Sequence, residues 1–165
     1  MDWTKGRFSW QARVHLPALA HVAPANGVTL VFAPEGRGLA PLSEEERALA
    51  EWVPAHHADQ ARTVQKAVLA EYKDACSWVA DVQGASLPVI SGPEALGQVV
   101  TLKKIFVHQV SRDGRPYVGY QFECAWDGEH GLGVLMHGQR IVERGGADCA
   151  FLLWMAEEDA ASVDR

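Results

Sequence analysis

Paired cysteines and long apolar runs are missing from this sequence. It contains three cysteines, Cys76, Cys124 and Cys149, and no CxxC pair. An odd set of unpaired cysteines is typical of a protein in a reducing compartment rather than of a disulfide-stabilised secreted one. No apolar run approaches the roughly 20 residues of a membrane-spanning helix, and the first residues lack the apolar centre of a secretion signal. We therefore expect a cytoplasmic protein without a membrane partner.

An excess of positive charge is also missing. The chain carries 15 Lys and Arg against 21 Asp and Glu, a formal net charge of −6. Binding to nucleic acid needs a basic surface that displaces counterions from phosphates, so we expect no nucleic-acid partner. Acidic residues gather in Glu44–Asp59 and Glu157–Asp164. These segments favour a basic protein partner, although acidity of this degree is also common among cytoplasmic proteins.

The motifs of common enzyme classes are absent as well. There is no P-loop, nucleophile elbow, Rossmann glycine fingerprint, HExxH zinc motif or EF-hand calcium loop. Cys76 and Cys124 fall on predicted apolar faces, where cysteine behaves as a small hydrophobe. Cys149 follows Asp148, an acidic neighbour that does not favour a thiolate. We expect no cofactor, and a non-enzymatic role is favoured over an enzyme.

The length and the order of the predicted elements indicate one domain over residues 1–165. A chain of 165 residues buries roughly 70% of its unfolded surface when it folds, so it needs no disulfide or metal for stability. Apolar and polar residues alternate from Phe8 to Leu16, which predicts a half-buried strand. A second apolar strand is predicted at Val28–Ala33, so residues 8–33 are expected to form an N-terminal β-hairpin.

A helical pair is predicted over residues 43–79. Ser43 and Glu46 have the spacing of a capping box, which predicts a first helix to about Trp52, where Pro54 ends it or opens the next. Apolar residues at helical spacing between Val64 and Val79 predict a second, longer helix at 56–79.

The remainder of the chain predicts a C-terminal antiparallel sheet over residues 99–145. Short connections with turn residues separate the predicted strands, so we expect a β-meander. The strands are Val99–Ser111, Tyr117–Trp126, Leu132–His137 and Arg140–Arg144. A terminal helix is predicted at 150–158. This order of elements predicts an α+β fold with the helical pair packed on one face of the sheet.

The densest group of chemically useful side chains is Asp127, Glu129 and His130, between two predicted strands. Two carboxylates and an imidazole at one corner could hold a divalent metal or act as acid and base. The spacing matches no established metal motif. Asp127-Gly128 is also a turn dipeptide, and Asp127 can accept hydrogen bonds from the amides that follow it. A structural corner is therefore favoured over a metal site.

The residues around this corner resemble a bacterial family of domains of unknown function. The family pattern is Trp-Asp-acid-Glu-His-Gly-Leu-Gly, then an apolar hairpin and a Gly-x-Ala-Asp turn. Here these segments are Trp126–Gly133, Val134–Glu143 and Gly145–Asp148. Gly128 replaces the family's acid, which weakens a metal site built from several carboxylates. The resemblance extends back to the helical pair and covers most of the chain.

Domains of this kind are similar to immunity or interaction proteins of bacterial toxin and defence loci, and the resemblance implies family membership without assigning a particular activity. The sequence thus leaves two hypotheses for function. The first is a non-enzymatic binding protein, immunity-like, that caps a basic partner. The alternative is a metal-binding domain or metal-dependent hydrolase that uses Asp127, Glu129 and His130.

Overall fold

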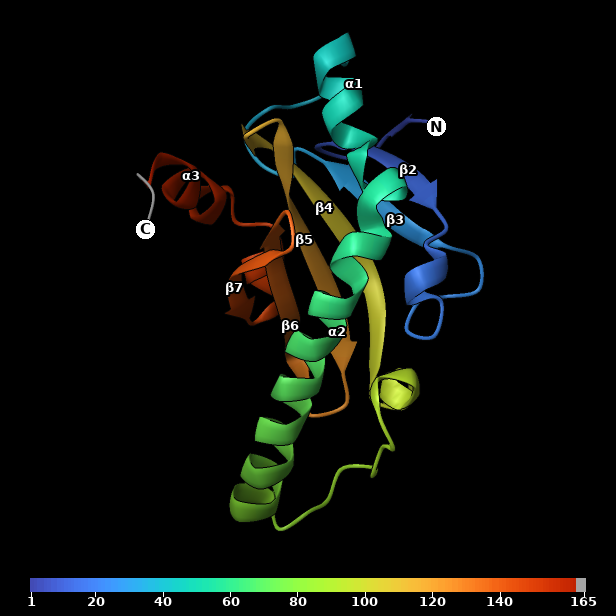
Figure 1. The fold of residues 1–165 in the computed structure, drawn as a ribbon, viewed down its shortest axis with the longest axis vertical. Coiled ribbons are helices and arrows are strands. Elements are labelled where there is room, and N and C mark those ends of the chain that lie inside the picture. Colours follow the sequence, from blue (N-terminus) through green and yellow to red (C-terminus); the bar gives the residue numbers. More distant parts are fainter. Residues whose placement is uncertain (163–165) are drawn as a thin grey trace.

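The computed structural model describes residues 1–162, and these share one β-sheet crossed on one face by a long helix (Figure 1). The seven strands of these residues lie side by side in the order of the sequence. They are β1 (Thr4–Lys5), β2 (Trp10–Val14), β3 (Val28–Phe32), β4 (Val100–Arg112), β5 (Arg115–Cys124), β6 (Asp127–His137) and β7 (Arg140–Gly145). The predicted α+β class is confirmed.

Antiparallel pairing joins all neighbouring strands except β3 and β4, which are parallel. The strands predicted at 99–145 pair antiparallel with their sequence neighbours. The strands of the predicted hairpin, β2 and β3, are also antiparallel, but residues 15–27 separate them and include a 3₁₀ helix, η1 (Pro17–Leu19). Strand β1 and the parallel pair were not predicted.

One long helix takes the place of the predicted helical pair. Helix α1 (Glu44–Ala50) is short, and α2 (Trp52–Trp78) begins after Glu51 and continues into a π-helical turn, η2 (Val79–Gln83). The predicted start at residue 56 is wrong because Pro54 lies in the first turn of α2. Backbone N–H groups of the first turn have no partner within the helix, so proline, which lacks an N–H, is tolerated there. The capping box is confirmed: Ser43 Oγ accepts from the Glu46 amide at 3.1 Å.

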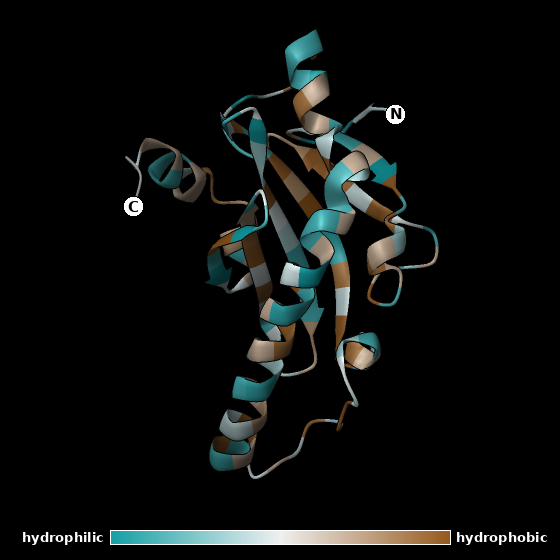
Figure 2. Ribbon diagram, viewed as in Figure 1, coloured by the Kyte–Doolittle hydropathy of each residue, from teal (hydrophilic) through white to brown (hydrophobic). Residues whose placement is uncertain are grey.

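The main core lies between α2 and the sheet. Figure 2 shows apolar residues on the strands beneath α2, while much of the helix's outward side is hydrophilic. Val68 on α2 is 1% exposed, as its helical spacing predicts. One buried polar link crosses this core: the Gln60 amide donates to Gly138 O at 2.6 Å and accepts from Tyr120 Oη at 2.7 Å. No helix within residues 1–162 has the length and apolar character needed to cross a bilayer.

The opposite face of the sheet is covered only in part. A 3₁₀ helix, η4 (Ala147–Ala150), lies against β5 and β6, and α3 (Leu153–Ala161) follows it. The predicted terminal helix at 150–158 is present as α3, but it lies at Leu153–Ala161, and residues 147–150 form the separate 3₁₀ helix η4. A Cβ atom placed on Gly119 of β5 would lie 1.8 Å from the Ala150 carbonyl oxygen. The glycine thus allows the main chain of η4 to touch the sheet.

We expect Gly119→Ala to lower the free energy of unfolding by at least about 1–3 kcal/mol. The added methyl group collides with backbone rather than with a flexible side chain, and overpacking of this kind costs about 1–3 kcal/mol or more. Thermal or urea unfolding measures the change. Gly128→Ala is the matched control, since no atom lies within 4 Å of its added Cβ. Equal stability of the two variants would contradict the close approach.

A buried histidine fastens the same segment. His108 on β4 is 0% exposed, its Nε2 lies 3.0 Å from Ala150 O, and its Nδ1 has no hydrogen-bond partner. Burial lowers the pKa of His108 below its ordinary value, which is about 6.5. The folded protein therefore resists the proton that the unfolded chain accepts.

Because the folded pKa of His108 is depressed, its contribution to stability is constant above the unfolded pKa and declines as the pH falls below about 6.5. We expect the free energy of unfolding to decrease more steeply between pH 7 and 5 in the wild type than in His108→Gln. Urea titrations at a series of pH values measure both slopes. Identical slopes would show that His108 titrates alike in the two states.

Candidate functional site

The predicted corner forms the first part of strand β6. β5 ends at Cys124 and β6 begins at Asp127, so the prediction of a strand starting at Leu132 is wrong. The ladder pairs Cys124 with Asp127 and Phe122 with Leu132, and the longer segment of β6 between these pairs forms a bulge. The corner residues lie in this bulge.

Hydrogen bonds to Asp127 hold the bulge in shape. Its Oδ1 accepts from the amide of His130 at 2.9 Å and from that of Glu129 at 3.2 Å. The His130 ring Nδ1 lies 3.1 Å from Oδ2 of the same carboxylate. The bond from the His130 amide is the largest cause that lowers the pKa of Asp127, with further contributions from the His130 ring and the Glu129 amide. This is the arrangement that the turn interpretation predicts.

The structure unites only two of the three predicted side chains. The backbone amide of Glu129 donates to Asp127, but its carboxylate forms no hydrogen bond or ion pair with Asp127 or His130. The His130 side chain is 75% exposed. Gly131 closes the bulge with φ +63°, and a Cβ there would lie 2.7 Å from Phe122 O. Within residues 1–162 no three His, Cys, Asp or Glu side chains gather in a way that could hold a metal ion. The geometry thus gives Asp127 a structural role, and metal binding here stays a hypothesis.

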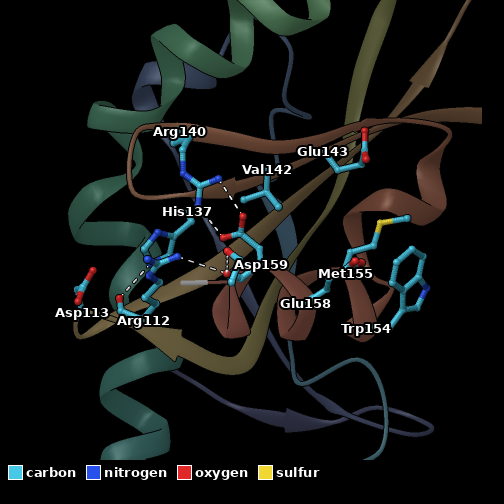
Figure 3. Close-up of a pocket in the computed structure, with 11 residues that line it drawn as sticks. Arg112, Asp113, His137, Arg140, Val142, Glu143, Trp154, Met155, Glu158 and Asp159 are labelled. Carbon is cyan, nitrogen blue, oxygen red and sulfur yellow. Dashed lines mark hydrogen bonds and ion pairs between the residues drawn. The ribbon is translucent and has the colours of Figure 1, made fainter. Parts of the chain in front are cut away.

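A pocket that the sequence did not indicate lies between α3 and the β6–β7 hairpin (Figure 3). Its volume is about 630 Å³. The turn between β4 and β5 closes one end of it. The lining residues are Arg112, Asp113, His137, Arg140, Val142, Glu143, Trp154, Met155, Glu158, Asp159 and Ser162.

Asp159 organises one wall of this pocket. Its carboxylate receives both Nη atoms of Arg140, at 3.0 and 2.6 Å, and the hydroxyl of Tyr117 at 2.7 Å. The Arg140 bond lowers the pKa of Asp159 and raises that of Arg140. Burial and the Asp159 carboxylate raise the pKa of Tyr117 to about 12. The Tyr117 ring stacks on His137, with centroids 4.6 Å apart. This wall is fixed, and Asp159 neutralises the Arg140 charge.

The other wall is acidic and aromatic. Trp154 on α3 is 54% exposed, and Figure 3 places it on the same side of the pocket as Glu143 of β7 and Met155. Glu158 lines the pocket from the next turn of α3. Among the described residues neither Glu143 nor Glu158 forms an ion pair, although Glu143 Oε1 accepts from the Arg144 amide at 3.0 Å. Two carboxylates beside an exposed indole form a site that suits a cation.

Residues 7–152 match the profile of a family described as a domain of unknown function, DUF6985. The chain belongs to this family. The predicted membership of an uncharacterised family is thus confirmed, and the Asp127–Gly131 bulge lies inside the matched range. Searches of curated proteins and of solved structures found no match. Strands β6 and β7 belong to the family's range and α3 follows it, so the pocket between them combines both parts.

Variants of Asp127 and Glu129 distinguish a structural role of the corner from metal binding. We expect Asp127→Ala to lower the free energy of unfolding by about 1 kcal/mol, because two backbone amides lose their acceptor. Glu129→Gln should leave it unchanged, since the Glu129 contact is made through its amide. Thermal unfolding measures both variants.

The same assay includes EDTA and added Zn²⁺ or Mn²⁺. An ion bound only by the folded state raises the melting temperature by mass action. We expect neither addition to move the wild-type transition. A metal-dependent rise that Glu129→Gln abolishes would support the metal hypothesis instead.

Proposed function

We propose that this protein is a non-enzymatic binding protein that docks a basic protein partner in the pocket between α3 and β7. The observation that carries this proposal is the exposed Trp154 indole, which shares the pocket with Glu143 and Glu158, two carboxylates that form no ion pair with any described residue. A cation over a tryptophan face gains about 0.5–1 kcal/mol at an exposed site and about 2 when desolvated. Met155 and Val142 offer apolar surface for the stem of an arginine or lysine.

The opposite wall supports a selective role for these carboxylates. Arg140 is held by Asp159 through two hydrogen bonds, so its charge is compensated inside the protein. A partner's cation therefore meets the acidic wall without full repulsion from Arg140. A wall in which Asp159 compensates Arg140, beside an acidic wall, orients a partner side chain and favours one sign of charge.

Further acidic residues support electrostatic steering toward the same partner. In the segment Glu44–Asp59, Glu46 pairs with Arg37 at 2.6 Å and Glu51 accepts from Trp3 Nε1 at 3.1 Å. Glu44, Glu45 and Asp59 are exposed and have no partner among the described residues. In the other segment, Glu157 and Glu158 are exposed on α3, while Asp164 lies outside the described residues. Exposed charges of one sign raise association rates more than they strengthen a complex.

The state of the thiols supports a role without catalysis. Cys124 and Cys149 are buried, and burial raises the pKa of both, that of Cys149 to about 11. Such thiols are protonated at neutral pH and make poor nucleophiles. Three free cysteines also support a cytoplasmic setting. The resemblance to bacterial immunity proteins extends the proposal: the basic partner is a toxin or defence protein that this protein caps.

Blocked peptides of equal length, with a central Arg-Arg, Lys-Lys, norleucine-norleucine or Glu-Glu pair, test the pocket. We expect the two cationic peptides to bind and to shift the Trp154 indole NMR signal, assigned with Trp154→Phe. Trp154→Ala and the double variant Glu143→Gln/Glu158→Gln should each weaken binding by about two- to tenfold, since each removes a contact of about 0.5–1.4 kcal/mol.

Glu157→Gln is the matched control, because Glu157 is exposed on α3 but does not line the pocket. It removes the same charge and should leave affinity nearly unchanged. Binding of the norleucine peptide with equal affinity, or equal weakening by the control, would overturn the proposal.

A further inference from the structure

We propose a second binding site, on the uncovered half of the sheet, for a small organic anion with a flat aromatic body. The site is a pocket of about 370 Å³ on the face opposite α2. It shares no lining residue with the pocket beside α3. The inference therefore does not depend on the proposed protein partner.

The floor of this site follows from the strand register. Gln11 of β2 pairs with Val31 of β3, and Val31 pairs with Phe106 of β4. These three residues form one row across the sheet on the face away from α2. The next row contains Lys104 of β4 and its partner Gln121 of β5. The floor is therefore apolar along one row and polar along the other.

Aromatic rings form the walls. Phe151 follows η4 and packs against Phe106, with ring centroids 5.5 Å apart and planes tilted by 58°. Phe8, in the segment before β2, lines the site and is 68% exposed. An apolar ring this exposed leaves much of its surface in water. A flat ligand placed between Phe8 and Phe151 would bury apolar surface of both rings and of the ligand itself.

The charges of the site are all of one sign. Arg7 and Lys104 line it, and no lining residue among those described is acidic. Arg7 lies over the Phe8 ring, 5.0 Å from its centroid, and neither cation forms an ion pair with a described residue. The neighbouring Lys103, by contrast, is bonded to Glu123 at 3.0 Å. The two unpaired cations stand out in a chain of net charge −6, and they select an anion.

Size and hydrogen bonding define the ligand further. A volume of about 370 Å³ lies at the lower end of the range for small-molecule pockets. The side-chain amides of Gln11 and Gln121 have no hydrogen-bond partner among the described residues and can donate to a carboxylate. The ligand that fits these groups is a one- or two-ring aromatic carboxylate, with its ring against Phe8, Phe106 and Phe151 and its anionic end toward Lys104 and Arg7.

The test uses 2-naphthoate as the probe, with neutral 2-naphthamide as the isosteric comparison and cationic 2-naphthylmethylammonium as the comparison of opposite charge. Calorimetry measures affinity, and NMR locates binding from shifts at Phe106 and Phe151. We expect only 2-naphthoate to bind well. Lys104→Gln and Arg7→Gln should each weaken it by about two- to fivefold, and Phe8→Ala by about two- to tenfold.

Two control variants test whether 2-naphthoate binds at this site rather than at a neighbouring charge or in the pocket beside α3. Lys103→Gln removes the adjacent, ion-paired lysine, and Trp154→Ala alters the other pocket; both should bind 2-naphthoate as the wild type does. Equal affinity for 2-naphthamide, loss of binding in either control, or no binding of 2-naphthoate would overturn the inference. So would an acidic aromatic peptide that binds through Lys104 while 2-naphthoate does not, because the occupant would then be a peptide.

Discussion

The main chain of residues 147–151 lies against the sheet because positions 119 and 133 are glycine. A Cβ on Gly133 would lie 2.6 Å from Gly146 O, and one on Gly119 would lie still closer to Ala150 O. The direct contact of backbone with sheet sets where this segment crosses β5 and β6. Its further course then fixes both candidate sites. Phe151 becomes a wall of the site on the open half of the sheet, and α3 is directed over β4 and β7 to build the other pocket.

This contact explains why the sheet face opposite α2 is covered over some strands and open over others. The half over β5 to β7 and the end of β4 is covered by η4 and α3. The half over β2, β3 and the rest of β4 carries Gln11 and Lys104 instead, beside the exposed Phe8. On the other face α2 buries a continuous apolar layer, and Gln60 ties the helix to Gly138 and Tyr120. The helix-covered face thus holds the main apolar core, and the partly open face holds both candidate sites.

Local chemistry in the sequence predicted the local structure well. Ser43 and Glu46 specify a helix start through two reciprocal hydrogen bonds. The turn at Asp113-Gly114 has positive φ at both residues, which the Asp-Gly pair accommodates. Asp127 binds the amides that follow it. In each case the interacting groups lie within a few residues of one another.

Longer-range features were not predictable in this way. The parallel pairing of β3 with β4 depends on how α1 and α2 carry the chain back across the sheet, and no short motif records that path. The continuity of α2 through Pro54 depends on where the helix begins. Glu143 on β7 and Trp154 on α3 line the same pocket because η4 packs on the sheet and positions α3. Gly119 and Gly133 were visible in the sequence, but the segment that needs them was not.

In the described part of the chain, the single parallel ladder is the only strand pairing between β1–β3 and β4–β7. β4 to β7 with η4 and α3 are built from short-range connections, whereas β1 to β3 reach β4 across the whole helical crossover. If the β3–β4 ladder opens, Val31 leaves Phe106 and the site on the open half is lost, while the pocket beside α3 stays whole within 112–162. Hydrogen exchange would then report two lifetimes, one for each site.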